Sequence, residues 1–304
     1  MLNLLHISDL HFGPHFVPQV ADALLEKLWE LDADILINSG DFTQRAKRQQ
    51  YEQARAFNQR LPRIPRVEIP GNHDVPLYRV AERILAPYAL YREYISTELD
   101  PVLRHEKAVI VALNSTDPLR AIVNGRVRPW QLEMCARVFK SAAPDALRIV
   151  VAHHHFAPAP DYERGQVMPR SKRALDRFTQ LKVDLALGGH MHRAYIGNSL
   201  DVYPGVDREH GIIIVQSGTS TSRRGRARER EKNSFNHIQV SDEIVRITHY
   251  MHFADAQGFQ PVSRHIFPRV GRHYLRDSPP AACESRAQPR DADLIRTVPP
   301  AGAA

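Results

Sequence analysis

Short runs of apolar residues, each ended by a polar or glycine-rich cluster, recur along this chain. Runs of this length between turn-forming residues are typical of buried β-strands. A single run fits a buried helix equally well, but seven runs with the same kind of ending favour strands. The predicted strands cover residues 4–7, 35–37, 67–69, 109–113, 149–152, 183–187 and 212–215.

Segments with apolar residues at helical spacing separate these runs. Val20, Leu24 and Leu28 recur on one side of residues 17–31. Strands that alternate with helices favour an α/β fold. Such folds bind ligands at the carboxyl ends of their strands, so we expect the polar clusters to converge. The other predicted helices cover residues 46–61, a segment that starts at Pro129, and residues 171–181.

The chain does not keep this alternation throughout. Residues 75–98 are predicted as a helical excursion, and residues 235–240 and 244–249 as a β-hairpin. The last 28 residues hold five prolines and seven alanines without periodicity, which is typical of a mobile tail. We expect a main domain over 1–250 with an insert at 75–105, an extension over 251–276 and a disordered tail over 277–304.

The composition is that of a globular protein, with 43% hydrophobic and 25% charged residues. It excludes wholly disordered, collagen-like and coiled-coil chains. Forty-one Lys and Arg against 34 Asp and Glu give a net charge of +7, which favours anionic partners. Cys135 and Cys283 lie far apart in sequence, which excludes a disulfide scaffold or thiolate cluster and fits a reducing compartment.

Targeting signals do not stand out in the sequence. The first residues have neither the basic region nor the apolar stretch of a signal peptide. The sequence contains no run of about 18 apolar residues, so no membrane span is predicted. We therefore expect a cytoplasmic protein with no membrane partner.

The polar endings of the predicted strands carry the residues suited to metal chemistry. Asp9 and His11 are two apart, so on an extended segment they point the same way and can chelate one cation. His190 and His192 have the same spacing, and Asp41 is the carboxylate that two cations could share. Taken singly, each of these residues could instead stabilise a turn or cap a helix.

Carboxylate, imidazole and amide groups without thiolates suit Mn, Fe, Zn, Co or Ni. Two such ions about 3.5–4 Å apart can generate hydroxide at neutral pH and neutralise phosphate oxygens. The polar clusters are Asp9-x-His11, Gly40-Asp41, Gly71-Asn72-His73-Asp74, the triple histidine from His153, and Gly189-His190-x-His192.

The order DxH, GD, GNHD, H and GHxH resembles the calcineurin-like metallophosphoesterase superfamily, in particular its bacterial single-domain members, which include cyclic-nucleotide phosphodiesterases. Residues 5–15, 40–46, 71–74 and 189–192 carry the resemblance, which spans about residues 1–250. It implies a four-layer αββα sandwich, with two mixed sheets flanked by helices. The metals would lie at one edge of the sandwich.

The resemblance also implies two metal sites that share one ligand and a bridging hydroxide that attacks phosphorus. His73 would protonate the leaving alkoxide or orient a phosphoryl oxygen, and Asp74 would orient His73. The first ion would be held by Asp9, His11, Asp41 and His192, and the second by Asp41, Asn72, His153 and His190.

Three assignments stay open at this point. His153 is favoured over His155 as the ligand from the triple histidine. Arg45 either contacts substrate phosphate or, as we favour, pairs with a carboxylate. The basic stretch 223–232 is interpreted as a solvated loop, with polyanion binding as the alternative.

We predict a binuclear phosphodiesterase that uses Mn, Fe or Zn and acts on cyclic nucleotides or other small phosphodiesters. A phosphomonoesterase or a nuclease on the same site is the alternative, although nucleic acid is not the favoured partner. A non-catalytic scaffold is disfavoured because all the ligand positions and the GNHD histidine are kept. A homodimer is left open, as is a pocket-shaping or subunit-pairing role for the insert.

Overall fold

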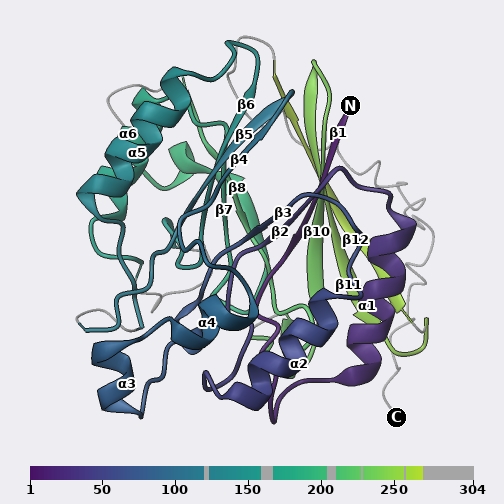
Figure 1. The fold of residues 1–304 in the computed structure, drawn as a ribbon. Coiled ribbons are helices and arrows are strands. Elements are labelled where there is room, and N and C mark those ends of the chain that lie inside the picture. Colours follow the sequence, from purple (N-terminus) through teal and green to yellow (C-terminus); the bar gives the residue numbers. More distant parts are fainter. Residues whose placement is uncertain (120–122, 159–166, 204–209, 227–228, 257, 270–304) are drawn as a thin grey trace, which may run out of the picture.

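Two six-stranded β-sheets face each other, and helices cover both outer faces (Figure 1). The structure is a computed structural model that describes residues 1–119, 123–158, 167–203, 210–226, 229–256 and 258–269. The predicted α/β sandwich of two mixed sheets flanked by helices is confirmed.

The first sheet has the order β12-β11-β10-β1-β2-β3. Its strands β1, β2 and β3 are parallel, whereas β10, β11 and β12 add antiparallel neighbours on the other side of β1. The bounds are β1 Leu2–Ile7, β2 Ile35–Asn38, β3 Arg66–Glu68, β10 Ser234–Val240, β11 Ile244–Phe253 and β12 Gly258–Pro268.

The second sheet has the order β4-β5-β6-β7-β9-β8. Its four central strands are parallel, and the two edge strands β4 and β8 are antiparallel to their neighbours. The bounds are β4 Val102–His105, β5 Ala108–Leu113, β6 Leu147–Ala152, β7 Leu185–Gly188, β8 Tyr195–Asn198 and β9 Ile213–Gln216.

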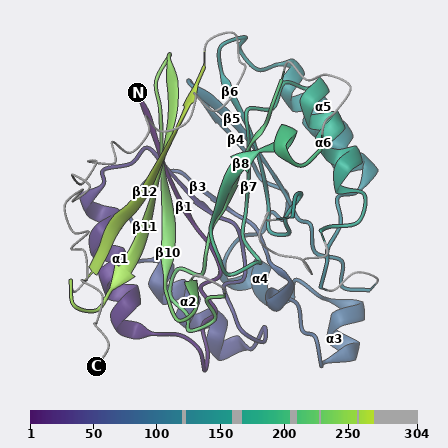
Figure 2. The same cartoon turned by 180° about the vertical axis from the view of Figure 1, so that it is seen from behind.

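The helices fall into two groups, which Figure 2 shows from behind. Side chains of α1, α2 and α4 pack on the outer face of the first sheet, and those of α5 and α6 on the outer face of the second. The short helix α3 has no buried residue. The bounds are α1 Pro18–Glu30, α2 Arg48–Asn58, α3 Val80–Leu85, α4 Ala89–Tyr94, α5 Pro129–Lys140 and α6 Ser171–Gln180.

Alternate residues of each central strand supply the core between the sheets. Leu2 and Leu4 of β1 pack in one cluster with Ile149 and Val151 of β6. Leu5, the next residue of β1, faces the helices instead. Because these strands are buried on both faces, their sequences are continuous apolar runs.

All seven predicted strands are present, and the four predicted helices coincide with α1, α2, α5 and α6. The hairpin is β10–β11, and β12 joins the same sheet, so residues up to 268 extend the layer beyond the predicted domain limit at 250. Within the described ranges, no helix has the length and apolarity to cross a bilayer. The predicted tail lies outside the described residues.

Candidate metal centre

The candidate ligands gather where strands of both sheets end. Asp9 and His11 follow β1, Asp41 follows β2, and Asn72 opens a short 3₁₀ turn after β3. His153 directly follows β6 in the second sheet. The remaining two ligands, His190 and His192, follow β7. The convergence predicted for the polar clusters is therefore present.

Five of these residues have left-handed backbone. The φ angles are 54° at Asp9, 50° at His11, 57° at Asp41, 71° at His190 and 55° at His192. The prediction that Asp9 and His11 share an extended segment is therefore wrong. Their side chains converge because tight loops turn them inward, since a left-handed residue reverses the chain direction locally.

The first cluster consists of Asp9, His11, Asp41 and His192, whose donor atoms all lie within 4.8 Å of one another. Nε2 of His192 lies 3.1 Å from Oδ1 of Asp9 and 3.0 Å from Nε2 of His11. Nε2 of His11 lies 3.6 Å from Oδ2 of Asp41. Two carboxylates and two imidazoles that face one point form a donor set suited to a transition-metal ion.

In the carboxylates of Asp9 and Asp41, one oxygen accepts hydrogen bonds, and the other accepts none from the described residues. Oδ2 of Asp9 accepts hydrogen bonds from the Ser8 hydroxyl at 2.6 Å and from the backbone N–H of His190 at 2.9 Å. Oδ1 of Asp41 accepts the N–H of His73 at 2.8 Å. Asp9 Oδ1 and Asp41 Oδ2 are buried without a hydrogen-bond donor. Burying an unpaired carboxylate oxygen is costly, so a cation fits this place.

The second cluster lies on the other side of Asp41. Oδ1 of Asn72 lies 3.2 Å from Nε2 of His153 and 3.0 Å from Nδ1 of His190. Nε2 of His153 lies 3.3 Å from Asp41 Oδ2. The same Asp41 oxygen therefore faces both clusters, and Asp41 is placed to be the ligand that two cations would share.

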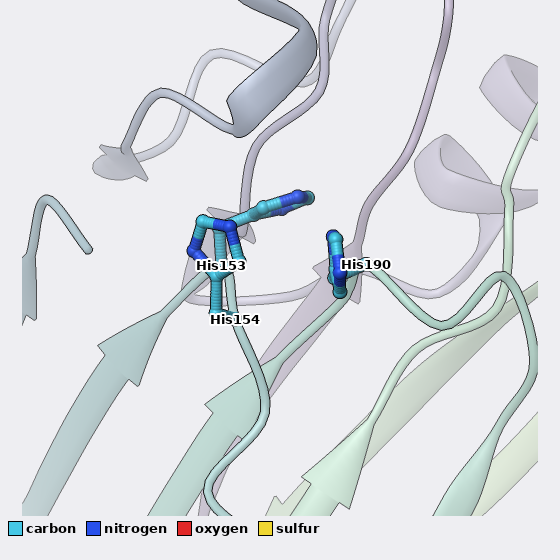
Figure 3. Close-up of side chains that lie close together, drawn as sticks. All are labelled: His153, His154 and His190. Atoms are coloured by element: carbon cyan, nitrogen blue, oxygen red, sulfur yellow. The ribbon is translucent and has the colours of Figure 1, made fainter. Parts of the chain in front are cut away.

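His154 is a member of this cluster that the sequence did not predict. Strand alternation would turn it away, yet its ring centroid lies 4.7 Å from that of His190 and 5.0 Å from that of His153 (Figure 3). Its Nδ1 lies 2.8 Å from the Ser115 hydroxyl. The His155 ring stacks farther out, 5.9 Å from His190, so His153 is the better placed ligand.

Backbone carbonyl groups orient two of the histidines. Nδ1 of His153 lies 2.9 Å from the Ser39 carbonyl oxygen, and Nδ1 of His192 lies 3.0 Å from that of Arg224. A carbonyl only accepts, so each Nδ1 carries the proton. In the neutral form of each ring, Nε2 then has its lone pair toward the centre, as a metal ligand requires, so a bound cation would displace any proton held there.

The carboxylates and imidazoles shift one another's pKa values. Burial opposes ionisation of Asp9 and Asp41, but the surrounding histidines hold both pKa values well below the usual range. Burial also opposes protonation of His153, yet the Asp41 and Asp9 carboxylates raise its pKa to about 9. Burial lowers the pKa of His11 to about 3, which keeps that ring neutral. The centre thus attracts positive charge.

His73 lies beside the ligands and is held on both ring nitrogens. Its Nδ1 lies 3.0 Å from the Gln44 carbonyl oxygen, and the Arg224 guanidinium donates to its Nε2 at 3.0 Å. Asp74 does not have the predicted role of orienting this ring. Its carboxylate accepts the N–H groups of Phe42 and Gly71 instead, at 3.1 and 2.9 Å.

Asp74 is therefore a residue that positions loops. It also accepts the N–H and hydroxyl of Thr43 at 2.8 and 3.1 Å, so it ties the loop that carries Asp41 to the loop that carries Asn72. Burial and the nearby Asp41 carboxylate raise the pKa of Asp74 to about 7, while the backbone donors oppose that rise. Its position next to the histidine in the GNHD motif does not reveal this role.

A pocket of about 260 Å³ opens on this centre. Contrary to the prediction, Arg45 forms no ion pair with a carboxylate among the described residues, and its guanidinium carbon lies 4.8 Å from the centre of the Tyr78 ring. Arg224 and Arg226 also line the pocket, so the basic stretch is not simply a solvated loop. The lining consists of Gln44, Arg45, Asn72, His73, Val75, Leu77, Val123, His190, His192, Arg224 and Arg226.

Comparisons with known proteins agree with this architecture. PhoD has a TM-score of 0.68 at 12% identity, over 92% of this chain and 72% of its own. A purple acid phosphatase, PPD1, from yellow lupin (Lupinus luteus) seeds has a TM-score of 0.63 at 14% identity, over 88% of this chain and 53% of its own. This chain thus spans about half the length of the lupin protein.

A dimetal phosphatase from Danio rerio has a TM-score of 0.59 at 10% identity, over 90% of this chain and 99% of its own. Identities this low show a shared fold only. No curated protein matches the sequence of this chain. The family model described as calcineurin-like phosphoesterase matches residues 2–194, which is more than half of the chain. This chain carries a candidate metal-binding site, and it belongs to the calcineurin-like phosphoesterase family.

Proposed function

We propose that this protein is a binuclear metal-dependent phosphodiesterase that acts on small phosphodiesters. The observation that carries the proposal is Oδ2 of Asp41, which lies between two ligand clusters whose members Asn72, His190 and His192 line a pocket. One ion would be held by Asp9, His11, Asp41 and His192, and the other by Asp41, Asn72, His153 and His190. Such a pair supplies a nucleophilic water at neutral pH and neutralises phosphoryl oxygens.

His73 and Arg224 would act on the opposite side of the substrate. Arg224 donates to Nε2 of His73, which therefore carries a lone pair in this arrangement. A phosphoryl oxygen in the pocket would offer Arg224 a charged acceptor, and charge-assisted hydrogen bonds are stronger than neutral ones. Nε2 of His73 would then be free to carry the proton that the leaving alkoxide takes up.

Metal analysis and a substrate pair test this proposal together. We expect nearly two equivalents of Mn, Fe or Zn in protein purified without chelator, and turnover of bis-p-nitrophenyl phosphate with added Mn. Asp41→Ala and Asn72→Ala should each lose metal and reduce turnover by about 100-fold or more. Asp242→Ala, in the exposed turn between β10 and β11, is the matched control. Unchanged activity in the first two variants would refute the proposal.

A phosphomonoesterase is the second candidate, because the guanidinium groups of the pocket suit the extra charge of a monoester. Turnover of p-nitrophenyl phosphate alone would establish it.

A nuclease is the third candidate, and it would show activity on DNA or RNA that falls steeply as the salt concentration rises. Metal without turnover of either small ester would make nucleic acid the next substrate to test, and neither metal nor turnover would favour a scaffold.

A further inference from the structure

Three arginines form a cationic wall of the pocket, beside the ligand clusters. Arg45 reaches it from the loop after β2, whereas Arg224 and Arg226 reach it from the segment between β9 and β10. That segment is firmly attached, because the N–H of Arg226 donates to the His192 carbonyl oxygen at 3.0 Å. The two backbones therefore fix the guanidinium groups around one space.

The partners of these arginines are uncharged. Arg224 donates to Gln44 Oε1 at 3.2 Å and to the His73 ring, and Arg45 lies over Tyr78. Across the described ranges, none of the three arginines forms an ion pair with a carboxylate. Other arginines of this chain, such as Arg48 and Arg60, do form such pairs. Like charges gathered without a counter-anion repel one another, so a bound anion would stabilise this wall.

With a pair of divalent cations bound, one phosphodiester would not supply enough negative charge for the whole pocket. Two such cations, the carboxylates of Asp9 and Asp41 and one hydroxide would sum to about one positive charge. A phosphodiester carries one negative charge and would balance it. The three guanidinium groups would then remain without a balancing charge.

We propose that Arg45 and Arg226 bind a second phosphate group of the substrate, on the part that does not leave, while Arg224 contacts the phosphodiester beside His73. This inference rests on the proposed phosphodiesterase function and narrows its substrate class to phosphodiesters that carry a further phosphate. Guanidinium groups favour phosphate because their planar donors match its oxygens. Val75, Leu77 and Val123 line the pocket as well and would contact the uncharged linker between the two phosphates.

A ladder of synthetic substrates tests the proposal without assuming a natural one. Each substrate is a p-nitrophenyl phosphodiester of a linear alkanediol of two to six carbons, with the far end either hydroxyl or phosphate. For at least one chain length we expect the added phosphate to raise kcat/KM about tenfold or more in the Mn-loaded protein. Arg45→Gln and Arg226→Gln should each reduce this preference several-fold. Arg223→Gln, an exposed neighbour outside the pocket lining, should keep it.

A binding measurement separates this inference from the proposed function. Calorimetry on the same protein compares alkanediol bisphosphates with the matching monophosphates, and needs no turnover. Tighter bisphosphate binding that Arg226→Gln removes supports the anion site even if neither ester series turns over, in which case only the phosphodiesterase proposal fails. The inference is overturned if no chain length gains more than about twofold, or if Arg223→Gln reduces the preference as much as Arg226→Gln.

Discussion

Gly71 lies so close to Asp41 that no side chain fits between them. A Cβ at position 71 would lie 2.2 Å from Asp41 Oδ1 and 2.4 Å from the Asp41 backbone nitrogen. We expect Gly71→Ala to displace the carboxylate, lower metal content, reduce activity at least about tenfold and destabilise the fold by roughly 1–3 kcal/mol. Metal analysis and urea denaturation measure these effects.

Gly258→Ala is the matched control for this prediction. A Cβ at position 258 would meet only the Ala256 carbonyl oxygen, at 4.0 Å. The stability and metal content of Gly258→Ala should equal those of the wild type. Full metal content in Gly71→Ala would contradict the predicted displacement of Asp41.

Glu68 makes the stability of the fold depend on pH. Burial raises its pKa to about 7 from 4.5, although Arg66 and a hydrogen bond from Asn58 oppose the rise. The folded state then binds the proton more tightly than the unfolded chain, so the free energy of unfolding falls as pH rises between these two values. The side chain is partly accessible to solvent, so we expect Glu68 to contribute about 1–3 kcal/mol of this fall.

Urea denaturation at about pH 5 and about pH 8 checks this prediction. The fall in unfolding free energy should be smaller in Glu68→Gln, because its amide does not ionise. Glu26→Gln, on the exposed side of α1, should keep the wild-type fall. An equal fall in Glu68→Gln and wild type would show that other groups cause it.

Residue types in the sequence identified the donor set of the site but not its local geometry. The predicted Asp, Asn and His residues after the apolar runs lie together in two clusters, and their role as metal ligands stays a prediction. The left-handed backbone of Asp9 and His11 depends on contacts with neighbouring loops, such as the hydrogen bonds from Asp9 and His11 N–H to carbonyl groups of Gly40 and Asp41. Arg224 meets His73 across 151 positions of sequence, and no local pattern signals such a contact.

Among the elements, strands that are buried on both faces give the clearest signal in the sequence. Every residue of β5 is buried, and its run of apolar residues is therefore a clear signal. The edge strand β4 has no fully buried residue, and most of β12 is exposed. The sequences of β4 and β12 do not form apolar runs, so only their pairing with a neighbouring strand identifies them as strands.

Phe259 fixes β12 to the rest of the molecule. Its side chain is fully buried, and its ring centroid lies 5.3 Å from that of Phe235 on β10. We expect Phe259→Ala to lower the free energy of unfolding by about 3–5 kcal/mol, because it leaves a cavity under α1. Denaturant titration measures the loss.

Val262 on the same strand is the control for this prediction, since 43% of its surface is exposed. Val262→Ala should change stability by less than about 0.5 kcal/mol. Two strands separate β12 from β1, so turnover per folded molecule should be unchanged in both variants. Loss of turnover in folded Phe259→Ala would show that β12 affects the site.

In the whole molecule, the candidate metal centre joins the two sheets. Asp9, His11, Asp41 and Asn72 follow strands of the first sheet, and the histidines at 153, 190 and 192 follow strands of the second. Ions bound there would hold the two layers together at one edge. A ligand that binds only the folded state stabilises it in proportion to the logarithm of its concentration.

We expect saturating Mn to raise the Tm of the chelator-treated protein by about 5 °C or more. His153→Ala should lose at least half of this increase, because it removes a ligand from the second sheet. His15→Ala, an exposed histidine outside both clusters, should keep all of it. Differential scanning calorimetry measures the Tm, and an equal increase in His153→Ala would argue against this ligand.

At the left-handed residues of the centre, the backbone geometry that places the donor atoms also lowers the stability of the fold. A non-glycine residue in that region of backbone space carries strain of roughly 1–3 kcal/mol, and five ligands share this geometry. Glycine adopts such backbone without this strain. Replacing a ligand with glycine would therefore relieve strain but would also remove a donor atom from the centre. Substitutions that relieve strain at these positions are expected to weaken metal binding, so stability and activity place opposite demands on the same residues.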